Sequence, residues 1–77
     1  MYEILLIDNN DNTVTYRVID SDNAIDKGTI TVTKSNNDYV LSSGGEIDNS
    51  FVAAAYRTIK ECISRNIYPR HYVNGWG

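Results

Sequence analysis

With 77 residues and a net charge of −3, the chain has room for one small domain and a small hydrophobic core. The single cysteine, Cys62, excludes an intramolecular disulfide framework and is typical of a reducing compartment. Ten acidic residues against seven Lys and Arg disfavour a general nucleic-acid binder, in which basic residues dominate and cluster.

The N-terminal stretch 1–8 is apolar but far too short to span a membrane. It also lacks the basic n-region of a secretory signal peptide. We therefore expect a cytoplasmic protein.

Four segments alternate apolar or aromatic residues with polar ones, which predicts β-strands at 2–7, 13–19, 29–34 and 39–42. Because side chains alternate along a strand, Val14, Tyr16 and Val18 share one face, and the threonines of 29–34 lie opposite Ile30 and Val32. The connecting segments are short, which favours a sequential antiparallel meander.

A helix is predicted at about 49–65. Gly44 and Gly45 end the strand pattern, and Asp48, Asn49 or Ser50 offers an N-cap oxygen, with Ile47 and Val52 as a hydrophobic staple if Asp48 is the cap. The apolar stripe recurs at three- and four-residue steps: Val52, Ala55, Ile59, Cys62 and Ile63. We interpret Cys62 as a small core residue on this stripe.

The helix is expected to end at Asn66 in a left-handed conformation, and Pro69 prevents its resumption. The tail 67–77 is aromatic, and either a short strand or a loop fits it. The predicted fold is a single α+β domain over 1–77. A three- to four-stranded antiparallel sheet packs its Val14, Tyr16, Val18 side against one amphipathic helix, and an aromatic C-terminal tail follows.

No motif predicts catalysis or metal binding. Asp8-Asn9-Asn10-Asp11-Asn12 spaces oxygen ligands like the start of an EF-hand loop, but Thr13 and Ile19 replace the required glycine and glutamate. His71 is the only histidine and no serine lies in a nucleophile-elbow context, so neither a catalytic triad nor a zinc site is expected. We expect a protein that is not an enzyme and carries no cofactor.

Charge is divided unevenly along the chain. Residues 1–48 hold nine of the ten acids against three basic residues, a balance of −6, whereas residues 49–77 have a balance of +3. In a meander, the loop after the second strand and the loop entering the helix share one end of the sheet. We therefore predict an acidic binding surface at that end: Asp20, Asp22, Asp26, Glu46 and Asp48.

In an extended segment, Asp20 and Asp22 would lie about 6.5 Å apart, close to the roughly 7 Å between successive DNA phosphates. Loop acids for turn geometry and solubility are the alternative interpretation. The tail adds aromatic binding candidates, Tyr72 and Trp76, which would serve equally well to cap a small core.

Three stretches are similar to one known family: Thr13-Val14, then Asp20-Ser21-Asp22-Asn23, then Asn37-Asp38-Tyr39-Val40, followed by Ser42, Glu46 and a helix. Over about residues 13–60 the chain loosely resembles the small phage-encoded anti-CRISPR proteins that inhibit Cas9. Members that mimic DNA carry acidic clusters near a C-terminal helix, whereas this helix has a basic face. The resemblance implies a phage protein that acts in the bacterial host cell.

The leading hypothesis is thus a binding protein that blocks a Cas effector or another nucleic-acid-handling enzyme by occlusion, without itself contacting nucleic acid or membrane. One alternative is an assembly subunit that forms homodimers or larger oligomers through its threonine-rich sheet face or an edge strand. Another is a nucleic-acid-binding domain that uses the basic helix face and tail: Arg57, Lys60, Arg65 and Arg70.

Overall fold

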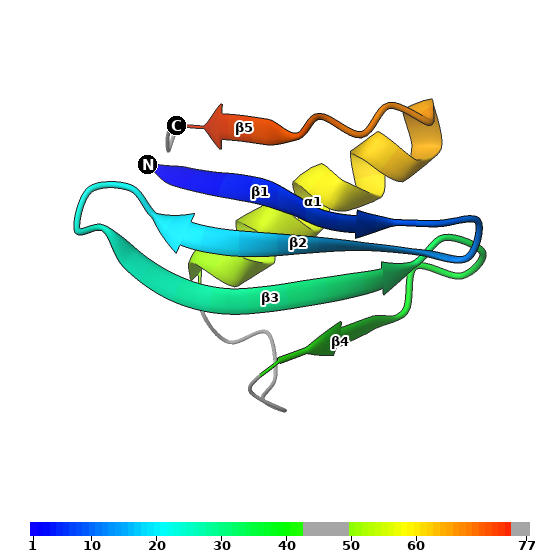
Figure 1. Cartoon of the computed structure of the whole chain (residues 1–77), viewed down its shortest axis with the longest axis horizontal. Coiled ribbons are helices and arrows are strands. Elements are labelled where there is room, and N and C mark those ends of the chain that lie inside the picture. The colour runs from blue at the N-terminus through cyan, green and yellow to red at the C-terminus, as the bar shows by residue number, and fades with distance from the viewer. Residues whose placement is uncertain (43–49, 75–77) are drawn as a thin grey trace.

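The computed structural model describes residues 1–42 and 50–74. In chain order the elements are β1 (Tyr2–Asn9), β2 (Thr13–Asp20), β3 (Ile25–Thr33), β4 (Tyr39–Leu41), α1 (Ser50–Arg65) and β5 (His71–Asn74). The strands form one antiparallel sheet in the order β4-β3-β2-β1-β5, and α1 crosses behind it on a diagonal (Figure 1). The α+β class and the meander of the first four strands are confirmed.

Strict alternation in β2 divides the sheet into a buried and an open face, because successive side chains point to opposite sides. Val14, Tyr16 and Val18 are at most 1% exposed, whereas Thr13, Thr15, Arg17 and Ile19 are partly exposed on the other face. The buried side faces α1, as the alternation predicts. The core also takes in neighbouring strands and the helix: Tyr2, Ile4, Ile30, Val32, Val52, Ala54, Ala55 and Ile59.

Helix α1 ends in a Schellman motif. Asn66 has a left-handed φ of 56°. The N–H of Ile67 donates to the carbonyl of Cys62 at 3.1 Å, and the N–H of Asn66 donates to the carbonyl of Ile63 at 3.2 Å. The left-handed Asn66 is therefore confirmed. The N-cap candidates Asp48 and Asn49, and Ile47 of the staple, lie outside the described residues.

Two buried tyrosines connect the sheet to the segments that cover it. The Tyr2 hydroxyl lies 2.5 Å from Thr58 Oγ1 on α1, and the Tyr16 hydroxyl donates to the Pro69 carbonyl at 2.7 Å. Burial raises the pKa of Tyr16 to about 12, so this hydroxyl stays protonated and remains a donor at neutral pH. These contacts fix both α1 and the connection to β5 on the sheet.

Strand β3 begins at Ile25, four residues before the predicted start at Thr29. Gly28 interrupts the apolar alternation, but its φ of +94° lets the strand pass through a register shift between Arg17 and Ile19 of β2. A Cβ at this position would lie 2.8 Å from Ser42 Oγ, which itself accepts the Thr29 N–H. Part of the predicted acidic loop is therefore strand.

The predicted three to four strands are in fact five, because part of the aromatic tail pairs with β1. His71–Asn74 lies antiparallel to Tyr2–Leu5, and Leu6 donates its N–H to the Arg70 carbonyl at 2.8 Å. Alternation over four residues is too weak a sequence signal to distinguish such a strand from a loop. Among the described residues, no helix combines the length and apolar character needed to cross a membrane.

Truncation of Ile59 tests how far stability depends on the contact between helix and sheet. Ile59 is fully buried, so Ile59→Ala is expected to lower the free energy of unfolding by roughly 2 to 5 kcal/mol. Ile67→Ala, at a residue 65% exposed, is the matched control and should cost far less. Urea denaturation of both variants measures the difference, and equal losses would contradict this account of the core.

Candidate functional site

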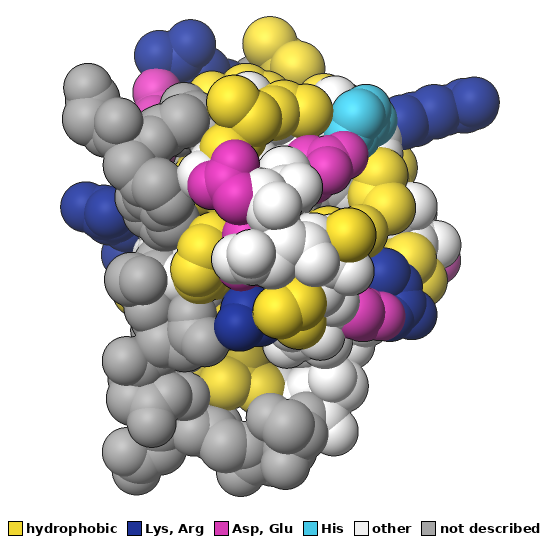
Figure 2. Space-filling model, turned by 90° about the vertical axis from the view of Figure 1, so that its left-hand side faces the viewer, with side chains coloured by type: hydrophobic (Ala, Val, Ile, Leu, Met, Phe, Trp, Pro, Cys, Tyr) yellow, Lys and Arg dark blue, Asp and Glu magenta, His cyan; other side chains and the backbone are white. Residues whose placement is uncertain are grey.

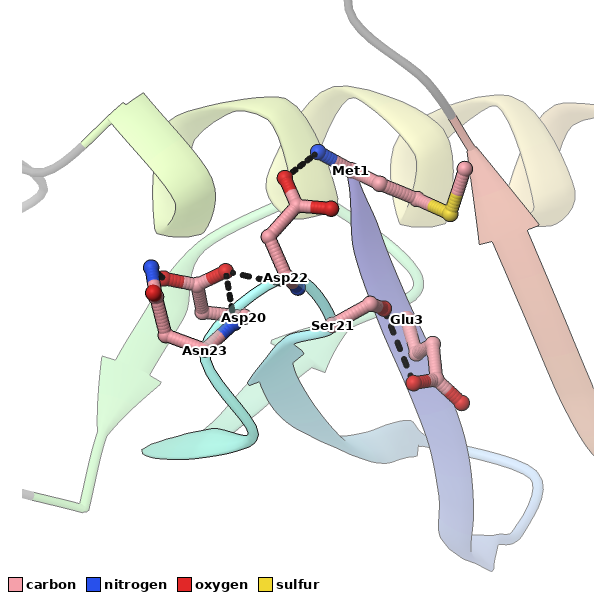
Figure 3. A network of polar contacts seen from close by, with 6 residues as sticks. All are labelled: Met1, Glu3, Asp20, Ser21, Asp22 and Asn23. Carbon is pink, nitrogen blue, oxygen red and sulfur yellow. Dashed lines mark hydrogen bonds and ion pairs between the residues drawn. The ribbon is translucent and has the colours of Figure 1, made fainter.

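The β2–β3 turn, the start of β1 and the end of β5 lie at the same end of the sheet (Figure 1). Four carboxylates belong to these segments and their surroundings. We call this the β2–β3 end and define it by Glu3, Asp20, Asp22 and Asp26. Figure 3 shows its central network, in which Asp20 and Glu3 anchor two separate sets of hydrogen bonds. The carboxylates differ in exposure and therefore in what they can do.

Asp20 organises the turn from a buried position, with only 3% of its surface exposed. Its carboxylate accepts the side-chain amide of Asn23 at 2.9 Å and the backbone N–H of Asp22 at 3.1 Å. These hydrogen bonds, the one from the Asn23 side chain first, hold the pKa of Asp20 below its ordinary value. Asp20 therefore shapes the turn rather than presenting a charge to a partner.

Residues 21–24 form a turn, and Ala24 adopts a left-handed φ of 53°. The extended spacing expected between Asp20 and Asp22 is therefore wrong, because the chain reverses immediately after Asp20. The analogy with successive DNA phosphates no longer follows from strand geometry.

Glu3 joins three segments on the open side of the sheet. It accepts the Ser21 hydroxyl at 2.8 Å through Oε2, and His71 Nε2 lies 2.6 Å from Oε1. The Ser21 hydrogen bond and then the His71 contact lower the pKa of Glu3. Because Glu3 lies between Ser21 and His71, the imidazole does not take the serine proton, and the group lacks the order of a catalytic triad.

Asp22 and Asp26 present exposed carboxylates, with side-chain exposures of 64% and 53%. Asp22 lies 2.9 Å from the Met1 ammonium, and Asp26 lies 2.5 Å from Arg17 Nη1. The backbone N–H of Gly28, followed by the Arg17 side chain, lowers the pKa of Asp26. Seen end-on, the acidic side chains form separate small groups, one of them against Lys or Arg atoms and one beside the histidine (Figure 2).

The other predicted binding residues are not part of this network. Glu46, Asp48 and Trp76 lie outside the described residues. Tyr72 is 38% exposed on β5, where it pairs with Ile4 and lines a groove on the helix side of the sheet. Tyr72 thus belongs to the groove, on the face of the sheet that α1 covers.

The groove has a volume of about 230 Å³ and lies between the end of α1 and β5. The lining residues come from three consecutive segments: Thr58, Glu61, Cys62, Arg65, Ile67, Pro69 and Tyr72. Sequence reasoning missed this site because it depends on β5 returning beside β1. An aromatic residue shortly after a helix-ending Asn and Pro is the signal that could have indicated it.

Cys62 is half-buried in this groove and lies outside the fully buried core, which corrects its predicted place in the core. Burial, followed by the nearby Glu61 carboxylate, raises the pKa of its thiol. A raised pKa keeps the thiol protonated at neutral pH and disfavours nucleophilic chemistry.

The basic face of α1 is partly engaged in contacts within the helix. Arg65 pairs with Glu61 at 2.7 Å, and Lys60 Nζ lies 4.4 Å from the centre of the Tyr56 ring. These contacts reduce the free positive charge that a nucleic acid would meet.

Across residues 1–42 and 50–74, no cluster of three or more His, Cys, Asp or Glu side chains is placed to hold a metal ion. No protein-family model matches the chain, and comparisons with curated proteins and with solved structures give no match either.

Replacement of Asp20 by Asn tests its role in the turn. The pKa of Asp20 is lower in the folded chain than its ordinary value of 3.8, so the ionised carboxylate stabilises the fold at any pH above 3.8. This stabilisation is lost as the pH falls through the pKa of the folded chain. Asp20→Asn should melt at a lower temperature than the wild type at neutral pH. The gap should stay constant down to about pH 5 and narrow as the pH falls below 3.8 toward the lower folded pKa.

Thermal unfolding followed by circular dichroism measures this gap. Asp11→Asn, an exposed change in the β1–β2 connection, is the control and should leave the melting temperature close to that of the wild type. A gap for Asp20→Asn that stays constant with pH would mean that ionisation of Asp20 does not stabilise the turn.

Proposed function

We propose that this chain is a non-enzymatic binding protein that blocks a bacterial nucleic-acid-handling complex by covering a basic surface, with the β2–β3 end as its contact. The observation that carries the proposal is the exposure of Asp22, on the turn that the buried Asp20 holds in shape, and of Asp26, at the start of β3 directly after that turn. A fixed turn presents charge without a further loss of conformational entropy on binding.

The ion pairs already made by these carboxylates are compatible with this role. Exposed surface salt bridges contribute little, because solvent screens them and long side chains lose entropy to form them. An arginine or lysine of a partner can therefore replace Arg17 beside Asp26 at small cost. Complementary charge would mainly speed association and select the partner.

The resemblance of residues 13–60 to anti-CRISPR proteins narrows the proposal to a Cas effector as the partner. Three of the residues that carry it, Asp20, Ser21 and Asp22, lie at the β2–β3 end. The basic groove that receives nucleic acid in such an enzyme is the surface that exposed carboxylates would occupy.

Inhibition of target-DNA binding by purified Cas9 with its guide RNA tests this directly. The wild-type chain should compete with DNA, and raising the salt concentration should weaken competition. The double variant Asp22→Lys, Asp26→Lys should lose at least about tenfold in apparent affinity. Asp20 is left unchanged so that the turn stays folded.

The matched control is Asp11→Lys, Asp38→Lys, which makes the same change in net charge at the exposed connections of the opposite end. It should compete as the wild type does. Equal losses in the two double variants would point to net charge alone, and competition unaffected by either would eliminate the β2–β3 end as the contact.

A second candidate function, self-assembly, is favoured by the open face of the sheet. Val40 and Val73 are 70% and 45% exposed there, and the broad side of the molecule measures 33 by 25 Å at most. That size is comparable to the roughly 800 Å² per partner of a standard interface. Sedimentation at several concentrations would distinguish the two, since a strict monomer rules out assembly.

A further inference from the structure

Within residues 1–42 and 50–74, no strand pairs with the outer edge of β5. β5 is the last strand of the sheet, next to β1 alone. Leu6 donates its N–H to the carbonyl of Arg70, so these residues form a hydrogen-bonded pair. Such pairs recur at every second residue of an antiparallel ladder, so Ile4 and Tyr72 form the next one and the N–H and carbonyl of Tyr72 point toward β1. His71 and Val73 must then direct their N–H and carbonyl groups outward, away from β1.

The groove beside this edge lies on the helix side of β5. Cys62, Ile67, Pro69 and Tyr72 give it an apolar lining, while the Glu61 and Arg65 ion pair adds charge. The diagonal course of α1 places its last turns near the start of β5 (Figure 1). A strand edge and a groove of side-chain size are therefore next to each other.

We propose that an extended segment of a partner protein binds along β5 as a sixth strand and inserts an apolar side chain into this groove. Outward backbone groups specify an extended chain, because only that conformation matches their spacing. Side chains of an added strand alternate between the two faces, so those on the helix side reach the groove. Backbone pairing supplies affinity, and the groove supplies selectivity.

Charge indicates the composition of the segment. Arg65 lines the groove and the exposed Arg70 directly precedes β5, against the single carboxylate of Glu61. Apart from Glu3, whose carboxylate contacts His71 on the open face of the sheet, the charges near the groove are therefore net positive, which favours an acidic residue next to the inserted apolar one. A second copy of this chain fits less well, because two paired strands of four residues cover far less than the roughly 800 Å² per partner of a stable dimer.

This site does not depend on the β2–β3 end, so the two proposals fail separately. The probe is a displayed library of random ten-residue linear peptides, selected on the full-length chain. Enriched peptides should contain apolar residues at alternate positions with an acidic neighbour. In nuclear magnetic resonance spectra, their binding should shift the amide signals of His71 and Val73 most.

Val73→Pro removes one outward N–H without breaking a hydrogen bond to β1, because the Val73 N–H faces away from β1. Affinity for a selected peptide, measured by fluorescence anisotropy, should fall at least about tenfold. Val73→Thr keeps the N–H and a β-branched side chain, so it is the matched control and should bind within about threefold of the wild type.

Ile67→Lys provides a second variant should proline prevent folding, since it changes the groove at a residue already 65% exposed. It too should weaken binding at least about tenfold. The proposal is overturned if no peptide is enriched, if selected peptides bind both variants as well as the wild type, or if sedimentation shows that a second copy occupies the β5 edge.

Discussion

The pleat of the sheet sends successive side chains to opposite faces, and a single helix can cover only one of them. The contact between α1 and this one face of the sheet decides which side chains are buried and which face stays open. Val14, Tyr16 and Val18 pack on the side of α1 and are shielded from solvent, while the threonine-rich face stays open. In so small a chain the core cannot be enlarged elsewhere, so the tyrosine hydroxyls add polar links where apolar area is limited.

The acidic residues are likewise divided between those that stabilise the fold and those that are exposed. Asp20 is buried and both of its carboxylate oxygens accept hydrogen bonds from the turn, so its charge is not available to a partner. Asp22 and Asp26 remain exposed, and Asp26 accepts the backbone N–H of Gly28 through Oδ1 at 2.8 Å while its other oxygen faces Arg17. The electrostatic character of the β2–β3 end is therefore set by two residues rather than by the number of acids in the sequence.

Much of the fold could be derived from the amino-acid pattern, because alternation and helical periodicity directly report which side chains are buried. The buried face of β2 and the end of α1 at Asn66 are examples. The start of β3 could not be derived, since Gly28 weakens a strand pattern, and its positive φ and the Ser42 hydroxyl close to it are visible only in the folded chain. β5 is too short to carry a pattern.

Prediction of the sites was limited in a different way. Composition identifies which residues can be charged, but only the folded backbone distinguishes the buried Asp20 from the exposed Asp22. The groove leaves only a weak trace in the sequence, an aromatic residue shortly after Asn66 and Pro69, because its lining joins the last turns of α1 to a strand that pairs with the other end of the chain.

The register of β1 shifts between Leu6 and Asp8, with the exposed Ile7 between them. Beyond this point β1 has no β5 beside it, and a straight strand would leave a second unprotected edge. The extra residue bends the backbone and increases its twist, which makes regular pairing with another chain difficult there. A bulge of one residue thus protects the sheet against uncontrolled growth and confines orderly strand addition on this side to the four residues of β5.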